Sequence, residues 1–523
     1  MTVTAFAAVG PMDDVNDREW ALQLGYFANL QNALNFKDRL IEAGFEAETV
    51  STGEAGNPGY RVIGGWADDP EQFDALRNRM EDAIGERGYV IKSPYLQPAN
   101  QLAEETAEEV FDQPRSRYLL AQAGGIPSTG GESVGSAAVS GYDPGVFRSP
   151  QDEMNSIPGF TGAGLQIIPT IGLSYGYDDN ITRSNRFQQS SYFYRISPAI
   201  RVELPSDHSV LALTAAIDFV RYSDSPTDDS DPWYIRADWA WDISTRQDLN
   251  LFAQYSDGTD ARGTGRRQGD AGLIPVPPDE WRRFDYGGAW RYGAVGSRGK
   301  LDLMLGASDL DYNNNKNRTE DLDRDWQYMG ATFYWRVAPK TSLLANVRYT
   351  DINYDVAGRD SDVTTWMLGA TWDASARTSG RISYGDQKKR FENPEREDYS
   401  GPVWVASISW KPRIYSVFTL TGSRNTQEPD GDGDYVLRQD ISLAWLHDWA
   451  TKFGTTVDVG YGEDDYRPYG RTDNIFYWSV GARYMFNPHF RFGASIQGYD
   501  RDSEIEEYNY KRYIYMLTLE ASF

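Results

Sequence analysis

Hydrophobic and polar residues alternate one by one through most of this chain, from about residue 163 to the C-terminus. In residues 231–244 (DPWYIRADWAWDIS), Trp, Ile and Ala fill one set of alternate positions, and Tyr, Arg and Asp fill most of the other. Successive side chains of a β-strand point to opposite faces, so one face suits an apolar medium and the other suits water. Eighteen such strands are expected, starting near residues 164, 190, 209, 232, 247, 280, 297, 325, 341, 361, 377, 400, 414, 435, 451, 472, 488 and 510.

The connections between these segments alternate in length. Tight turns such as Pro339-Lys340 and Ala450-Thr451 alternate with longer polar loops such as residues 178–189 and 259–280. Short turns on one side and long loops on the other are typical of a transmembrane β-barrel in the bacterial outer membrane. An even strand number leaves both chain ends in the periplasm. A soluble sandwich or propeller is the rival architecture, and it does not explain the alternating loop lengths or the aromatic residues near both strand ends.

The C-terminal sequence TLEASF ends an alternating segment on Phe523. This ending resembles the C-terminal signal that the outer-membrane assembly machinery reads. The resemblance implies that machinery and outer-membrane lipid as partners.

Residues 18–93 have a different pattern. Residues 20–27, 47–52, 60–64 and 89–92 are strand-like, and residues 32–43 and 70–84 have helical spacing. The first helix is expected to place Ala33, Phe36, Leu40 and Ile41 on one face. The order predicts a small α+β ferredoxin-like (βαββαβ) domain in front of the all-β transmembrane barrel of about 18 antiparallel strands.

Two segments of this domain resemble the SPOR family of peptidoglycan-binding modules. The segments are LQLGYF at residues 22–27 and YRVIGGW at residues 60–66, where Gly65-Trp66 replaces the usual Pro-Phe. The resemblance implies binding of peptidoglycan glycan strands stripped of stem peptides. It makes Gln23, Phe27, Tyr60 and Arg61 candidate contacts, because aromatic rings stack on sugars while amide and guanidinium groups bond hydroxyls. Phe27 and Trp66 are equally well explained as core residues.

Two further segments lie outside these two domains, one between them and one before the first. Residues 94–162 are rich in Gly, Ser, Pro and Ala toward their end, which predicts a flexible linker. Residues 1–17 are interpreted as the remnant of a signal region or as a disordered tail, since Ala5-Phe6-Ala7 resembles the end of a signal peptide.

Composition narrows the function classes. The net charge of -26 argues against nucleic-acid binding, which needs a basic face. The chain has no cysteine, and no run of about 20 apolar residues predicts a transmembrane helix. Only three histidines occur, His208, His447 and His489, and none has the spacing of a catalytic or metal site. No enzyme activity, cofactor or metal site is therefore expected.

Arginine recurs on the strand face that is expected to point inward. The candidate pore-lining residues are Arg195, Arg201, Arg236, Arg283, Arg291, Arg336, Arg348, Arg381, Arg438, Arg483, Arg491 and Arg512. Cationic walls favour anionic solutes, and guanidinium groups match carboxylates. The alternative is that these arginines pair with inward acids such as Asp238, Asp302 and Glu520 and stiffen the wall.

The first predicted strand, from Ile168-Pro169-Thr170 to Asp179-Asn180-Ile181, resembles the opening of β-barrel porins found with exopolysaccharide genes. The resemblance implies a channel that exports an anionic exopolysaccharide, with the secreted polysaccharide as a partner. Two other functions are retained as hypotheses. One is a general or small-solute porin, and the other is a structural anchor between outer membrane and cell wall, which a plug formed by residues 94–162 would favour.

Overall fold

The computed structural model describes residues 165–523 apart from 207, 274–275, 295, 357, 376, 414, 430, 432 and 488. In front of this region it describes residues 20–27, 33–34, 36–37, 40–41, 47–51, 60–67, 89–92 and 160–162. The predicted tail and nearly all of the predicted linker lie outside the described residues. None of the described helices is long and apolar enough to cross a membrane.

The N-terminal domain contains a four-stranded sheet. Its strands are β1 (Trp20–Phe27), β2 (Glu48–Ser51), β3 (Tyr60–Ala67) and β4 (Tyr89–Lys92), in the order β2-β3-β1-β4. Ala33, Leu40, Val62 and Ile63 are buried, whereas Ile41 is half exposed. The expectation that Ile41 shares the core face is therefore wrong, because it follows Leu40 directly and points to a different side of the helix. The predicted helix at residues 70–84 lies outside the described residues.

The barrel sheet begins with a short strand, β5 (Phe160–Gly162), that pairs with the start of β6. Its wall consists of β6 (Leu165–Asp178), β7 (Ser191–Pro205), β8 (Ser209–Ile217), β9 (Phe219–Tyr222), β10 (Trp233–Ser244), β11 (Gln247–Asp260), β12 (Asp279–Tyr292), β13 (Gly299–Tyr312), β14 (Arg324–Ala338), β15 (Thr341–Tyr354), β16 (Ser361–Ser375), β17 (Thr378–Phe391), β18 (Tyr399–Arg413), β19 (Ser416–Gln427), β20 (Tyr435–Ala450), β21 (Phe453–Arg467), β22 (Arg471–Asn487), β23 (Phe490–Ser503) and β24 (Tyr510–Ser522).

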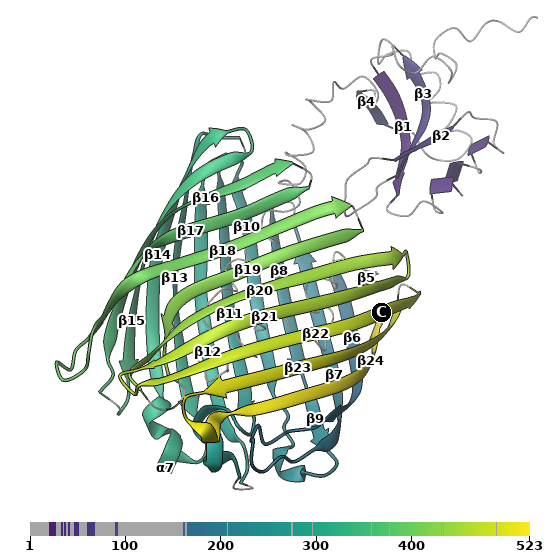
Figure 1. Ribbon diagram of the computed structural model, residues 1–523. Helices are drawn as coiled ribbons and strands as arrows, with labels where there is room; N and C mark the ends of the chain where they lie inside the picture. The colour runs from purple at the N-terminus through teal and green to yellow at the C-terminus, as the bar shows by residue number, and fades with distance from the viewer. Residues whose placement is uncertain are drawn as a thin grey trace, which may run out of the picture. The chain divides into compact units, whose positions relative to one another are not determined.

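The wall is a closed antiparallel sheet (Figure 1). Closure comes from β24, which pairs with β6 from Ile514 opposite Asp178 to Ser522 opposite Thr170. β8 and β9 both pair with β7 and occupy one position in the wall, interrupted at Asp218. The described residues therefore form an 18-stranded barrel, and the predicted strand number is confirmed. Each strand begins within two residues of its predicted start.

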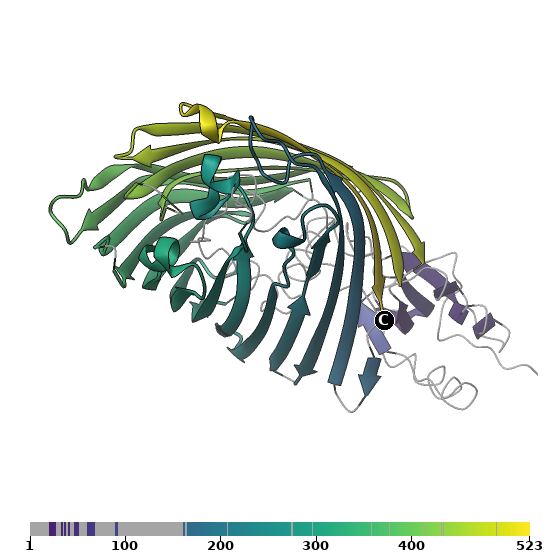
Figure 2. The same ribbon diagram turned by 90° about the horizontal axis from the view of Figure 1, so that it is seen from below.

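The two ends of the barrel differ as the connection lengths predict. Most turns at one end, which we call the turn end, leave two residues between strands, as at Pro339-Lys340. The other end, the loop end, has connections such as residues 179–190, 261–278 and 313–323. Short helices lie in these loops, including α7 (Lys316–Thr319), η3 (Pro226–Asp228), η4 (Gly265–Arg267), η5 (Gly269–Leu273), η6 (Glu320–Leu322) and η7 (Glu506–Tyr508). Figure 2 shows short helices of the loop end inside the outline of the strands.

The outer face of the wall is apolar. Leu305, Met329, Leu368 and Leu517 are each more than 60% exposed, which is explained by contact with lipid in a membrane barrel. Aromatic side chains stack near the turn end, with ring centroids 5.4 Å apart for Trp239 and Trp241. Such aromatic girdles mark the membrane interface.

One apolar cluster lies inside the loop end. Leu310, Tyr312, Trp326 and Tyr354 pack there with Leu322 from the loop between β13 and β14. Leu322 is 1% exposed, so this loop folds into the barrel rather than away from it. The interior below it is lined mainly by polar and charged side chains.

Candidate functional site

Strand alternation places the predicted arginines on the inner face, opposite the exposed apolar residues. On β10, for example, Arg236 and Asp238 alternate with the exposed Ile235 and Trp239. Arg236 donates from Nε to Asp238 at 2.8 Å. Residues two apart on a strand share a face, so an Arg-x-Asp or Arg-x-Glu sequence forms an ion pair within one strand.

Eight of the twelve predicted arginines hold a carboxylate, either on their own strand or across to another. The pairs are Arg201–Glu203, Arg236–Asp238, Arg283–Asp285, Arg291–Asp302, Arg438–Asp464, Arg483–Asp448, Arg491–Glu520 and Arg512–Asp178. These pairs support the wall-stiffening alternative for most of the set. Arg195 also lies on the inner face, and Arg336, Arg348 and Arg381 have no carboxylate within 4.0 Å among the described residues. The pore-lining role of the whole set stays a prediction.

The loop between β11 and β12 also enters the mouth at the loop end. This mouth loop, residues 261–278, connects β11 to β12 and is rich in glycine. Gly263, Gly265 and Gly269 have φ of 77°, 57° and 60°, a left-handed conformation that other residues seldom adopt. These glycines let the loop turn sharply and fold back from the rim.

The mouth loop contacts loops on several sides of the ring. Arg262 forms an ion pair with Asp228, between β9 and β10, and accepts a hydrogen bond from Arg183, between β6 and β7, on its carbonyl oxygen. Arg266 pairs with Asp321, between β13 and β14. A Cβ added to Gly431, between β19 and β20, would lie 3.8 Å from the Gly265 carbonyl oxygen. A segment with neighbours on so many sides lies within the mouth rather than on its rim.

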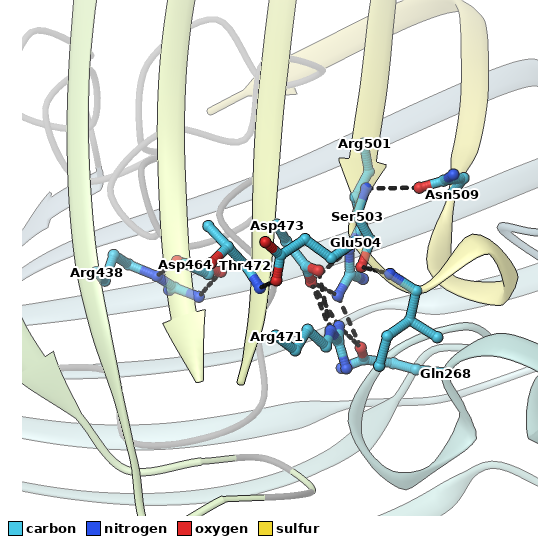
Figure 3. A network of polar contacts seen from close by, with 11 residues as sticks. Gln268, Arg438, Asp464, Arg471, Thr472, Asp473, Arg501, Ser503, Glu504 and Asn509 are labelled. Atoms are coloured by element: carbon cyan, nitrogen blue, oxygen red, sulfur yellow. Dashed lines mark hydrogen bonds and ion pairs between the residues drawn. The ribbon is translucent and has the colours of Figure 1, made fainter. Parts of the chain in front are cut away.

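The middle of this loop is held by a buried arginine pair (Figure 3). The side-chain oxygen of Gln268 accepts hydrogen bonds from Arg471 and Arg501, both at 2.8 Å. Both arginines also bind Asp473, which is fully buried. We call Gln268, Arg471, Asp473 and Arg501 the mouth latch. The two guanidinium groups share one carboxylate, that of Asp473. The amide oxygen of Gln268 accepts hydrogen bonds from N–H groups that a second anion would otherwise bind.

A second loop is fixed by a buried ion pair. Glu428 follows β19 and binds Lys389 of β17, and both side chains are almost fully buried. Lys389 also donates to Ser361 at 2.9 Å, and Tyr354 donates to Glu428 at 2.8 Å. Burial alone raises the pKa of Glu428, but the charge and hydrogen bond of Lys389 outweigh it and hold this pKa below its ordinary value. The carboxylate therefore stays ionised at neutral pH.

Sequence reasoning missed the mouth latch and Lys389. One signal was present, since Arg471-Thr472-Asp473 repeats the Arg-x-Asp spacing of Arg236 and Asp238. The position of Gln268 had no such signal, because its partners lie 203 and 233 residues away in the chain.

The predicted glycan contacts lie on two adjacent strands of the N-terminal sheet. Gln23 and Phe27 are on β1, Tyr60 and Arg61 are on β3, and Phe27 pairs directly with Tyr60. Their side chains lie outside the described residues, so their role in binding stays a prediction.

The three histidines lie near the turn end. His208 and His489 are in turns, and His489 Nδ1 is 2.8 Å from the Ser522 carbonyl oxygen. The His447 ring is 4.3 Å from that of Trp449 and 5.3 Å from that of Trp445. In the part of the chain that the structure describes, no three His, Asp or Glu side chains are placed to hold a metal ion.

A closed 18-stranded wall with an apolar exterior, a polar interior and loops at one end defines an outer-membrane barrel of the porin class. The chain belongs to the family described as Putative beta-barrel porin 2, whose model matches residues 162–523. Residues 16–92 match the SPOR domain, so the N-terminal domain is a periplasmic, peptidoglycan-binding module. The comparison with curated proteins finds no match.

Similar solved structures include other outer-membrane proteins. The *Pseudomonas aeruginosa* protein OpdK, solved with vanillate, is 10% identical, with 68% of this chain and 99% of that chain covered and a TM-score of 0.41. A BenF-like porin from *Pseudomonas fluorescens* Pf-5 is 7% identical, with 69% and 99% covered and a TM-score of 0.42. The siderophore receptor PirA from *Acinetobacter baumannii* is 9% identical, with 68% and 80% covered and a TM-score of 0.37.

Proposed function

We propose that this protein is a passive, non-enzymatic outer-membrane channel that exports an anionic exopolysaccharide and is tethered to peptidoglycan by its SPOR domain. The observation that carries the proposal is the polar, arginine-bearing inner face of a closed barrel. Barrels of 16–18 strands are wide enough to leave an aqueous channel. A cationic wall lowers the barrier for an anionic solute.

Three further points support this function. The opening of the first strand resembles that of barrels found with exopolysaccharide genes. Arg336, Arg348 and Arg381 add positive charge to the inner face and have no paired carboxylate among the residues that the structure describes. The chain end that resembles an assembly signal is part of the closed wall, since Phe523 donates its backbone N–H to the Pro169 carbonyl oxygen. The outer-membrane assembly machinery is therefore proposed as a partner during insertion.

A small-solute porin is the second candidate, and the mouth loop favours it. Residues 262–269 lie within the mouth and are held there by ion pairs and the mouth latch. A polymer would have to displace this loop, whereas a small solute would only have to pass beside it. A structural anchor that conducts nothing is the third hypothesis, and conductance separates it from the other two.

Single-channel recording of the purified protein in planar bilayers tests the proposal. We expect open-channel current that favours anions, and we expect added polyuronate to block it from the periplasmic side. Cation selectivity without block by polymer would contradict the export function. Block by uronic acid monomers alone would favour the small-solute porin, and no conductance would favour the anchor.

A further inference from the structure

The charge on the inner wall is unevenly balanced around the barrel. Eight predicted arginines are matched by carboxylates, and these pairs lie on β6, β7, β10, β12, β13 and β20 to β24. Arg336 on β14, Arg348 on β15 and Arg381 on β17 have no such partner in the described structure. We call these three residues the arginine wall.

The inner face of this sector has almost no negative charge. On β15, Arg348 alternates with the exposed Val347 and Tyr349, so it faces inward. By the same alternation, the inward positions of β14, β15, β17 and β18 contain no Asp or Glu. The inward face of β16 has one, Asp373, two residues from Thr371, the residue that pairs with Arg381. Among the described residues Asp373 forms no ion pair with the arginine wall, so it offsets this row of charge without being bound to it. The missing neutralisation is thus a property of several adjacent strands.

The strand register sets the three cations at two depths. Arg336 pairs with Ser342, Ser342 with Thr371, and Thr371 with Arg381, which places Arg336 and Arg381 on one row three strands apart. Neighbouring strands are about 4.8 Å apart, so this row spans roughly 14 Å. Arg348 is six residues from Ser342 on β15, about 20 Å further toward the loop end at about 3.4 Å per residue.

Aromatic and hydroxyl groups surround these cations. The Arg348 guanidinium lies 4.6 Å from the centre of the Tyr328 ring, and the Tyr334 hydroxyl is a hydrogen-bond partner of Arg381. Arg381 Nε is buried and has no acceptor among the described residues. Thr332 accepts a hydrogen bond from Asn346 at 2.8 Å, between the two depths. Tyr328 is itself buried, so its ring holds the Arg348 guanidinium in place rather than stacking on a solute. Guanidinium groups that bind carboxylates, beside hydroxyl and amide groups that bond sugar hydroxyls, are the chemistry of an acidic sugar site.

We propose that the arginine wall is a binding track for carboxylated sugars, with successive carboxylates held first at one depth and then at the other. This inference rests on the proposed channel function and names its ligand chemistry and its residues. Weak binding at several places along a pore lets a solute enter and still leave. The carboxylate can belong to a free uronic acid or to a polyuronate chain, and the same groups bind either.

The test measures block of single-channel current in planar bilayers by D-glucuronate, by alginate as a polyuronate, and by glucose and dextran as neutral controls. The variant is Arg336→Gln/Arg348→Gln/Arg381→Gln, and Arg348→Gln alone serves if the triple variant does not form a folded barrel. We expect D-glucuronate to block the wild type. The triple variant should need a D-glucuronate concentration at least about tenfold higher for the same block, the factor that corresponds to 1.4 kcal/mol. Anion preference in a salt gradient should fall with it.

The matched control removes an exposed ion pair outside the candidate pore-lining set, Arg282→Gln/Asp257→Asn, and it should keep both block and selectivity. Unchanged block in the triple variant, or an equal loss of block in the control, would overturn the proposal that the arginine wall binds carboxylated sugars. Block of the wild type by D-glucuronate but not by alginate would keep the arginine wall and reject polymer export. Equal block by glucose would overturn the requirement for a carboxylate.

Discussion

At the scale of single residues, buried ion pairs decide how the loop end is held. Lys389 and Glu428 are almost fully buried, and they join β17 to the loop after β19. A buried charge is expensive unless its partner is present, so removing one member of such a pair costs far more than removing an exposed one. The loop therefore stays in place because both charges are inside.

The first prediction concerns this pair. Glu428→Ala should lower the temperature at which the folded barrel is lost, because Lys389 is then buried without a counter-charge, at a cost of about 3–5 kcal/mol. Heat-modifiability on SDS gels and thermal unfolding in detergent both measure the temperature at which the folded barrel is lost. Asp500→Ala, which breaks the exposed pair with Lys511, is the control and should leave the transition unchanged. Equal effects of the two substitutions would contradict the argument.

The second prediction concerns pH. The pKa of Glu428 lies below its ordinary value, because Lys389 outweighs the effect of burial. A carboxyl group with a lowered folded pKa stabilises above its unfolded pKa, and this stability is lost as pH falls through the folded pKa. The thermal transition of the wild type should therefore be steady near neutral pH and fall once pH drops below about 4.5. Glu428→Gln should flatten that fall, and an unchanged slope would count against this pair as its origin.

At the scale of elements, the mouth loop is one of the loops that fold into the barrel at the loop end. Its glycines permit the inward fold, and its contacts with loops around the ring hold it. The mouth latch fixes the middle of the loop through one amide oxygen, so this part is held by hydrogen bonds to a neutral group rather than by an ion pair. A single side chain can therefore be changed to release it.

The third prediction follows from that attachment. Replacing residues 262–272 with a short Gly-Ser linker should raise single-channel conductance, because the loop no longer obstructs the mouth. Gln268→Ala should leave the average conductance nearer the wild type but increase its fluctuations, since it releases only the middle of the loop and the ion pairs of Arg262 and Arg266 remain. Gln327→Ala, on the exposed outer face of β14, is the control. A loop replacement with wild-type conductance would show that the constriction lies elsewhere.

At the scale of the whole molecule, the chain has two modules, and each one contacts a different part of the cell envelope. The barrel is held in the outer membrane by its apolar exterior, and the SPOR domain binds peptidoglycan in the periplasm. Each module has its own β-sheet, so membrane insertion and peptidoglycan binding depend on different residues. Their fusion in one chain joins the membrane to the cell wall.

The fourth prediction separates the modules. Deleting residues 16–92 should leave a heat-modifiable barrel in the outer-membrane fraction but abolish co-sedimentation with sacculi whose stem peptides have been removed. Tyr60→Ala/Arg61→Ala should weaken co-sedimentation, whereas Ile41→Ala, at an exposed helical position, should not. Binding that survives the deletion would place the wall contact outside the SPOR domain.

Much of the fold was predictable because its signals are local. Alternation in a segment such as residues 231–244 is enough to define a strand and its two faces, and turns such as Pro339-Lys340 define where the strands reverse. The inward position of Arg236 follows from the same alternation. Its partner Asp238 was predictable as well, since both residues lie on one strand face.

The sequence alone determined the strand number, the faces of each strand, the membrane class and the SPOR module, since these depend on neighbours in the chain. Only the tertiary structure decided which charges meet between strands and loops that are far apart in the chain. Gln268 reaches Arg471 and Arg501, and Glu428 reaches Lys389, because barrel closure brings distant strands and loops together at one mouth. Such contacts depend on distances of a few ångströms in space, and no pattern along the chain carries that information.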